Sequence, residues 1–453
     1  MKSITRKEFI KRSLAVSVGF YGLSHFLLGP QQLFSRPFHS RNKWLELPEG
    51  FDAFLISEWG QPMSDGLLVP GKPDGMGSFS LGGKTIIVRN HEVSPRDVAS
   101  GAFGEDYRLL QQLSGEDFFD HGFGKNPSLG GTTSLVFNEA TGKVEQQFLS
   151  LAGTNRNCAG GITPWNSWIT CEEDVTPKTD GNETEHGYNF EVPAAAQGLV
   201  KPVPLKAMGR FNHEAVSVNP NSGYVYQTED ANDSLIYRFI PNTPGKLAEG
   251  GELQALVIKG KPGFDSRNWE QQSIKTGESL EVEWITLDEV ESEKNDLRLR
   301  GREMGAAVFA RGEGMWYGKE EIYFACTNGG EKNLGQVFKY IPSPLEGTAS
   351  EQEQPGKLML FAESEDRETL KNCDNLTVAP WGDVVLCEDH SNAFIRGITP
   401  QGNLYNIARN IHSDSELAGL CFSPSGKYLF VNIQKQGLTL AITGPWESLK
   451  PIS

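Results

Sequence analysis

The chain has 453 residues, a formal net charge of −16 and 38% hydrophobic residues, with 50 glycines and 25 prolines. This abundance of turn-forming residues argues against a helix bundle. Residues 1–43 hold eight Lys and Arg against one acid, Glu8, so the other 410 residues together carry −23. A body this acidic lacks the basic footprint that nucleic acids require, and we expect no nucleic-acid partner.

The first 43 residues have the pattern of an export signal and leader. Basic residues at 2–12 precede a mostly apolar stretch at 14–28, which is shorter than the roughly 20 residues of a membrane-spanning helix. The Arg6-Lys7 pair resembles a twin-arginine signal with Lys in the second position, so the twin-arginine export machinery is an expected partner. An ordinary secretory signal, or one kept as an anchor, is the alternative. We therefore expect a periplasmic or secreted protein.

The rest of the chain, residues 44–453, repeats one unit: a polar residue, a short apolar strand, a turn, a second strand and a polar or acidic end. The turn Asn219-Pro-Asn-Ser-Gly223 is one example of the hairpin chemistry. The six copies lie at 74–92, 157–173, 214–230, 311–328, 374–389 and 416–432.

Further strand-like runs lie between these copies, at 235–240, 336–341, 358–362, 394–398 and 404–408. Two hairpins per unit make a four-stranded blade, so the repeat predicts an all-β fold, a six-bladed β-propeller forming one domain over residues 44–453. The polar segments 100–127, 175–206 and 260–300 lack the unit and are expected as loop or helical insertions. A β-sandwich or a set of unrelated hairpins is the alternative. Because a propeller closes on itself, we expect a monomer.

The six cysteines form no C-x-x-C pair, which argues against a zinc ribbon or a thioredoxin-like site. Several lie in strand-like runs, where buried free thiols are expected; disulfides are the alternative for an exported protein. They are Cys158, Cys171, Cys326, Cys373, Cys387 and Cys421.

The innermost hairpin of each propeller blade lines the central channel, so the polar ends of all six copies should converge at one mouth. So many carboxylates would repel one another without bound cations. Carboxylate and amide oxygens favour calcium, whereas a cysteine thiolate favours a transition metal. Solvated surface acids are the alternative. The converging residues are Glu92, Asn157, Cys158, Glu172, Glu173, Glu214, Glu229, Asp230, Glu313, Asp374, Asn375, Glu388, Asp389 and Glu416.

Two kinds of neighbour complete this predicted site. The guanidinium of Arg311 is suited to fork two hydrogen bonds onto phosphate oxygens, with a rim ion pair as the alternative. His91 and His213 each precede a glutamate. Because side chains alternate along a strand, we expect Glu92 and Glu214 to face the channel and the histidines to support them.

Seven stretches resemble the PhoX-type alkaline phosphatases: 89–92, 130–133, 153–165, 170–173, 209–215, 229–230 and 311–315. The resemblance implies a six-bladed propeller, twin-arginine export, and an active site of ferric iron (Fe3+) with calcium (Ca2+). It implies that Arg311 contacts the substrate phosphate and that Cys158 is an iron ligand. The carboxylate ligands that it implies are Glu229 and Glu313, followed by Glu172, Glu173 and Asp389.

This resemblance further implies hydrolysis of small-molecule phosphate monoesters by in-line attack of a metal-bound oxygen, with no side-chain nucleophile. Two alternatives stay open. A calcium-dependent propeller lactonase or esterase would use one calcium and no thiolate ligand. A secreted binding propeller would hold structural calcium and show no turnover.

Overall fold

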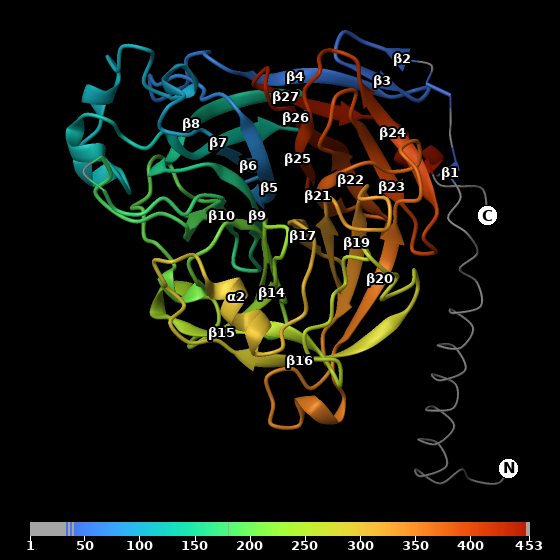
Figure 1. Ribbon diagram of the computed structural model, residues 1–453. Helices are drawn as coiled ribbons and strands as arrows, with labels where there is room; N and C mark the ends of the chain where they lie inside the picture. The colour runs from blue at the N-terminus through green and yellow to red at the C-terminus, as the bar shows by residue number, and fades with distance from the viewer. Residues whose placement is uncertain (1–32, 35–36, 39, 180, 450–453) are drawn as a thin grey trace, which may run out of the picture.

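The structure is a computed structural model that describes residues 33–34, 37–38, 40–179 and 181–449. Of the predicted export signal and leader at residues 1–43, positions 1–32, 35–36 and 39 lie outside the described residues. The described chain is all-β, and its one α-helix is α2 (Leu297–Glu303). Its sheets are arranged around a common centre as a β-propeller (Figure 1).

The strands nearest the centre are covered on both faces, and beyond the polar residues at their starts they are mostly apolar or small. In β12 (His213–Val218) all six residues are buried, as expected for a strand covered on both sides. The turn to β13 (Val225–Glu229) is closed by Gly223, whose N–H donates to the carbonyl of Asn219. Gly223 has φ +74, a conformation that glycine adopts without a steric penalty.

The strands form five hydrogen-bonded sheets. The first contains β5 (Pro73–Leu81), β6 (Lys84–His91), β7 (Gly130–Asn138) and β8 (Lys143–Thr154). The second contains β11 (Asn189–Pro193), β10 (Ser167–Glu172) and β9 (Asn157–Ile162). The third has nine strands, in the order β12, β13, β14 (Ile236–Pro241), β15 (Gly251–Ile258), β16 (Ser279–Thr286), β20 (Lys357–Glu363), β19 (Gln336–Ile341), β18 (Ile322–Cys326) and β17 (Gly312–Tyr317).

The other two sheets include the first strands of the described chain. One has seven strands: β2 (Ser40–Arg41), β3 (Leu45–Leu47), β24 (Leu404–Asn410), β23 (Phe394–Ile398), β22 (Val384–Glu388) and β21 (Cys373–Val378), with β1 (Leu33–Phe34) parallel to β24. The other contains β25 (Leu417–Phe422), β26 (Tyr428–Ile433), β27 (Leu438–Thr443) and β4 (Asp52–Glu58).

These sheets correct the expectation of six separate four-stranded blades. The segment 260–300, predicted as an insertion, contains β16, which pairs with β15 on one side and with β20 on the other. It therefore joins two of the predicted units into one nine-stranded sheet. The segment 175–206, also predicted as an insertion, supplies β11 to the three-stranded sheet. Only two of the five sheets have four strands.

The first strands of the six predicted hairpins contact one another in a closed cycle at the centre of the molecule (Figure 1). The order around the centre is β5, β9, β12, β17, β21 and β25. Each strand contacts the next one in this order, and the last, β25, contacts the first, β5. On the outside, β4 pairs with β27, with Asp52 opposite Thr443. The ring is therefore closed by strands from opposite ends of the chain.

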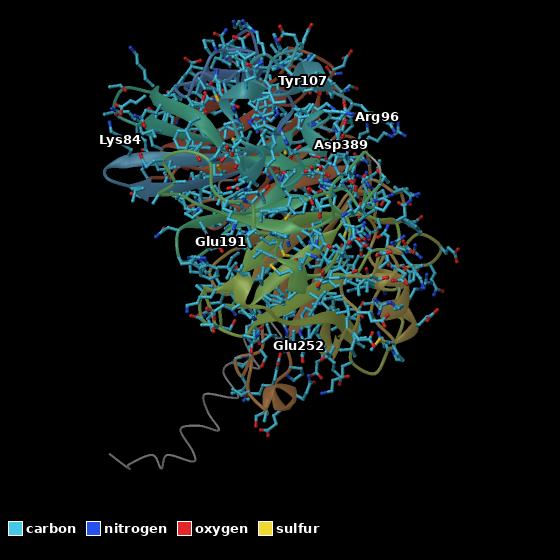
Figure 2. The ribbon with its side chains drawn as sticks, turned by 90° about the vertical axis from the view of Figure 1, so that its left-hand side faces the viewer. Lys84, Arg96, Tyr107, Glu191, Glu252 and Asp389 are labelled. Carbon is cyan, nitrogen blue, oxygen red and sulfur yellow. The ribbon has the colours of Figure 1, made fainter. Side chains whose placement is uncertain are left out.

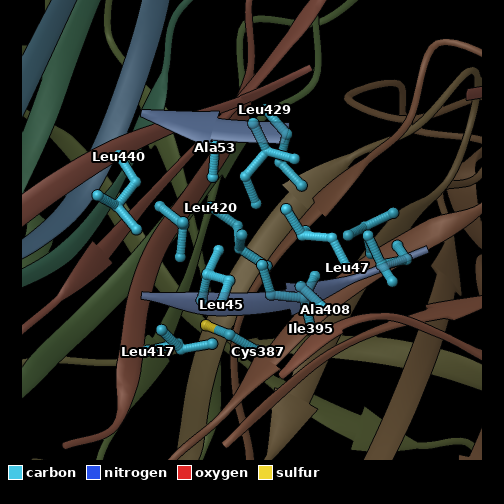
Figure 3. Close-up of a cluster of buried hydrophobic side chains, with 14 of the residues drawn as sticks. Leu45, Leu47, Ala53, Cys387, Ile395, Ala408, Leu417, Leu420, Leu429 and Leu440 are labelled. Atoms are coloured by element: carbon cyan, nitrogen blue, oxygen red, sulfur yellow. The ribbon is translucent and has the colours of Figure 1, made fainter. Parts of the chain in front are cut away.

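The core lies between neighbouring sheets. In the largest cluster, Ile395 and Ala408 of the seven-stranded sheet lie with Leu420 and Leu429 of the adjoining sheet (Figure 3). All are buried, and burying one leucine side chain contributes roughly 1.5–3 kcal/mol. This packing holds the inner strands at fixed spacing. The described residues include no helix with the length and apolar character needed to cross a bilayer.

Candidate metal centre

A polar cavity of about 250 Å³ lies where the ends of the inner hairpins meet. Its lining is almost entirely charged: Asp74, Glu92, Arg156, Cys158, Glu173, Glu214, Asp230, Arg311, Glu313, Asp374, Asp389, Glu416 and Gln434. Figure 2, turned by 90°, shows Asp389 toward the face opposite to Lys84, the residue that begins β6. The turn between β5 and β6 therefore lies away from the cavity residue Asp389.

One set of lining residues comes from the innermost strands. In five of these strands the second residue faces the cavity, and in the sixth the residue just before the strand does so. The set is Asp74 of β5, Cys158 of β9, Glu214 of β12, Glu313 of β17, Asp374 of β21 and Glu416 before β25. The same position in each repeat thus delivers one donor side chain to a common point.

A second set follows the second strand of five of the six hairpins. It consists of Glu92 after β6, Glu173 after β10, Asp230 after β13, Asp389 after β22 and Gln434 after β26. The N–H of Glu92 donates to the carbonyl of Lys72 at 2.9 Å, and the N–H of Glu173 donates to that of Arg156 at 3.0 Å. Equivalent bonds join Asp230 to Asn212 and Asp389 to Asn372. The backbone thus fixes where these side chains enter the cavity.

Five residues predicted to converge here do not line the cavity: Asn157, Glu172, Glu229, Asn375 and Glu388. Glu388 is buried and bonds to Arg396 and His390, and the side-chain oxygen of Asn375 accepts the N–H of Gly419.

Glu172 is fully buried and accepts hydrogen bonds from the backbone of Asn155, Gly187 and Tyr188 and from His186. Because side chains alternate along a strand, Glu173 points to the cavity while its neighbour Glu172 points into the protein.

Glu229 and Asn157 are turned away from the cavity in the same manner. Glu229 accepts a hydrogen bond from the Tyr237 hydroxyl at 2.7 Å, and the next residue, Asp230, takes the cavity position. Asn157 bonds to the hydroxyls of Thr154 and Thr170. The ligand role that the family resemblance implied for Glu229 therefore has no support in this geometry.

The two histidines lie as strand alternation predicts. His91 is buried, with Nδ1 at 2.9 Å from the carbonyl of Gly71 and Nε2 at 2.9 Å from the Thr133 hydroxyl. His213 is buried beside the carbonyl of Gly209. Burial lowers the pKa of His213 to about 3, so this ring is neutral. The adjacent Glu92 and Glu214 face the cavity.

Nine carboxyl groups against two guanidinium groups line the cavity, so the site would carry −7 with every carboxyl group ionised and the thiol neutral. Burial is the main reason that the pKa of Glu173 rises to about 8, that of Asp374 to about 7 and that of Glu416 to about 10, with neighbouring acids contributing. The pKa values of Asp74, Glu214 and Glu313 also lie well above their usual range, for the same reasons. Without cations these acids retain protons, and cations would displace them.

Two groups of donor atoms are close enough to share one ion each. The oxygens of Glu214, Glu313 and Asp374 lie within 4.8 Å of one another, an all-oxygen set that suits a hard cation such as calcium. The donors of Glu92, Cys158 and Glu173 meet the same limit, and the thiol makes that set suitable for a transition metal. Cys158 donates to Glu173 at 2.9 Å.

The two arginines neutralise part of this charge. Arg311 forks onto Asp230, with Nε and Nη2 each 2.8 Å from a carboxylate oxygen, and also donates to Glu313 at 2.9 Å. These hydrogen bonds raise the pKa of Arg311. The ion pair given above as the alternative role of Arg311 is thus present. The two donors predicted to bind phosphate are bonded to Asp230 in this structure.

Three lining residues were not predicted as site residues: Asp74, Arg156 and Gln434. Two of them had a signal in the repeat itself. Asp74 opens the first copy at the position that Cys158 holds in the second, and Arg156 precedes Cys158 by two residues, as Arg311 precedes Glu313. For Gln434 the only signal is its place just beyond the last copy.

These features define a β-propeller protein in which acidic side chains and one thiol converge on a central candidate metal centre. The sequence profile of the family described as alkaline phosphatase PhoX matches residues 33–123 and 130–437. The chain therefore belongs to the PhoX alkaline phosphatase family. No curated protein matches the chain.

Several solved structures match the chain at low similarity. A gluconolactonase from Xanthomonas campestris is 11% identical with a TM-score of 0.42, and the match covers 90% of this chain and 99% of that one. A protein of unknown function from Bacteroides thetaiotaomicron is 9% identical with a TM-score of 0.44, covering 87% and 76%. Likenesses this weak carry no argument about activity.

Proposed function

We propose that this protein is an exported, metal-dependent phosphatase that hydrolyses small-molecule phosphate monoesters in the central cavity. One observation carries the proposal. A member of the PhoX alkaline phosphatase family concentrates nine carboxyl groups, one thiol and two guanidinium groups around a cavity of about 250 Å³. Such a site suits cations and the phosphate that they attract.

The donor chemistry fits the two metals that the family resemblance implied. Glu214, Glu313 and Asp374 would hold Ca2+, and Cys158 with Glu92 and Glu173 would hold Fe3+. When bound, these cations supply Lewis-acid polarisation of the ester and neutralise the charge that develops on the leaving oxygen.

The protein's own groups bind and orient the substrate. The side chain of Arg311 is 31% exposed, so its donors can turn from Asp230 to the oxygens of a phosphate. No Ser, Thr, His or Lys side chain is among the described lining residues. Burial, and to a lesser extent the negative charges of the nearby acids, raises the pKa of the Cys158 thiol well above its usual range. A thiol that stays protonated is a poor nucleophile. We therefore assign Cys158 to metal binding.

We further propose that the protein acts in the periplasm or outside the cell, after export by its N-terminal signal. Twin-arginine export carries folded proteins, which would allow the cations to be bound first.

The first experiment combines elemental analysis with an activity assay on protein purified after native export. We expect iron and calcium together, and release of p-nitrophenol from p-nitrophenyl phosphate. Arg311→Ala should reduce kcat/KM by about 100-fold, since a charged hydrogen bond contributes about 1.5–3 kcal/mol. Arg267→Ala is the matched control, because Arg267 pairs with Asp265 away from the cavity.

Two results would contradict the proposal. Calcium without iron and without phosphate release would indicate a binding propeller. Hydrolysis of a lactone in place of the phosphate ester would indicate a propeller lactonase.

A further inference from the structure

A second arginine, Arg156, occupies the position in its hairpin that Arg311 occupies in another. Each stands two residues before a cavity residue of an inner strand, Cys158 and Glu313 respectively. Both backbones are left-handed, with φ +43 at Arg156 and +50 at Arg311, which is uncommon for residues other than glycine. The carbonyl of each accepts a hydrogen bond at 3.0 Å from the residue that follows the second strand. Equivalent backbone therefore aims both guanidinium groups at the same cavity.

The contacts of the two arginines correspond as well. Arg156 donates from Nε at 3.0 Å and from Nη2 at 2.8 Å to Glu92, and from Nη2 at 2.5 Å to Glu173. Glu92 ends the preceding hairpin and Glu173 ends its own. Arg311 bonds to Asp230, which also ends a preceding hairpin, and to Glu313 of its own. Each arginine thus bridges acids from two hairpins.

We infer that Arg156 is a second substrate-binding guanidinium, which acts with Arg311 on the phosphate group; this inference rests on the proposed function. Glu92 and Glu173 are two of the three members of the thiol-containing ligand group. When these two carboxylates bind a cation, fewer of their oxygens are left to accept hydrogen bonds from Arg156. Its side chain is 39% exposed, so the freed donors face the cavity and not the core.

Two guanidinium groups select for a class of ester. A phosphate monoester dianion offers three terminal oxygens, enough to accept from two planar donor forks. A diester offers two terminal oxygens and one negative charge. The pair of arginines therefore favours monoesters over diesters, and Arg156 supplies part of that preference.

The test compares Arg156→Met with Lys72→Met in metal-loaded protein of verified iron and calcium content. Lys72 is a matched control, because it stands two residues before Asp74, has φ +45, and accepts the N–H of Glu92 through its carbonyl. Its amine, however, pairs with Asp97 at 3.2 Å and does not line the cavity.

For Arg156→Met we expect KM for p-nitrophenyl phosphate and Kd for inorganic phosphate, measured by calorimetry, to rise together by about 10- to 100-fold. We expect a smaller change in kcat. The preference of the Arg156→Met variant for p-nitrophenyl phosphate over bis(p-nitrophenyl) phosphate should fall by a similar factor. Lys72→Met should leave all three values as in the wild type. If Arg156→Met does not fold, Arg156→Lys retains the charge without the fork and should raise both KM and the phosphate Kd.

Two outcomes separate this inference from the proposed function. Wild-type hydrolysis with unchanged KM and phosphate Kd in the Arg156 variants would overturn the inference alone and leave Arg156 as a counter-ion. Absence of both hydrolysis and phosphate binding in the metal-loaded wild type would overturn the proposed function and the inference together.

Discussion

At the scale of single residues, neighbouring acids at the strand ends have opposite surroundings. Glu173 lines the cavity, while Glu172 is enclosed and accepts four hydrogen bonds from within the protein. Asp230 and Glu229 show the same division. The acids that line the cavity, Glu173 and Asp230, can bind cations. The acids buried within the protein, Glu172 and Glu229, instead accept hydrogen bonds from neighbouring segments of the chain.

The thiol provides a residue-scale prediction. Cys158→Ser should remove iron and leave calcium bound, because the all-oxygen group Glu214, Glu313 and Asp374 lacks the thiol. Elemental analysis of the purified variant measures both. Cys421→Ala is the control, since Cys421 is buried in a hydrophobic cluster away from the cavity. Unchanged iron in Cys158→Ser would contradict the assignment.

His186 provides a second prediction, of pH-dependent stability. Burial lowers the pKa of His186, but the charge of Glu172 and the hydrogen bond to Asp120 outweigh it and raise the pKa to about 10. The folded state therefore binds the proton more tightly than the unfolded state. This contribution is complete below about pH 6.5 and is lost as the pH rises through about 10.

Thermal unfolding of wild type and His186→Gln from pH 6 to 10 checks this. The Tm difference between them should be largest at pH 6 and should shrink toward pH 10. His412→Gln, at an exposed site, serves as the control. A constant difference across this range would show that His186 contributes by packing alone.

At the scale of elements, the inner strands approach one another so closely that two cavity donors, Asp74 and Glu313, are each followed by a glycine that has no room for a side chain. A Cβ added at Gly75 would lie 2.5 Å from Cα of Ala159, and one at Gly314 would lie 2.7 Å from Cα of Asn375. In both cases the obstructing atoms are backbone, which cannot turn aside. The spacing of the donor side chains thus depends on glycine in the strands.

Gly314→Ala tests this dependence. Because the new methyl group would push β21 away from β17, we expect a loss of roughly 1–3 kcal/mol in the free energy of unfolding. Weaker calcium binding should accompany it, since Glu313 and Asp374 would separate. Denaturant unfolding and calcium titration measure the two effects. Gly198→Ala, where the added atom meets open space, should show neither effect.

At the scale of the whole molecule, ring closure forces the acids together. The pairing of β4 with β27 completes the ring, and the inner strands then hold nine carboxyl groups around one cavity. Raised pKa values, about 8 for Glu173 and about 7 for Asp374, mean that the metal-free folded state binds more protons than the unfolded chain. Its stability therefore falls as the pH rises from about 4 to about 8.

Calcium should reverse this loss. We expect the rise in Tm on adding calcium to chelator-treated protein to be larger at pH 8 than at pH 5, because protons compete for the same oxygens at the lower pH. Sodium chloride at matched ionic strength is the control and should raise Tm much less. A calcium effect that does not vary with pH would contradict this account of the cavity.

The local pattern of the sequence determined the hairpins, their turns, the all-β class and most of the acids that meet at the centre. It did so because period-two alternation and turn chemistry are encoded by adjacent residues. Most donors at the starts of the inner strands, such as Cys158 and Glu313, were predicted from their repeated position.

Only the tertiary structure decided how sheets join and which acid of each adjacent pair faces the cavity. The pairing of β16 with both β15 and β20 depends on partners far away in sequence. Whether Glu172 or Glu173 points inward depends on where the strand ends, and a shift of one residue would exchange them. The bonds of Arg156 to Glu92 and of Arg311 to Asp230 likewise exist because ring closure brings separate hairpins into contact.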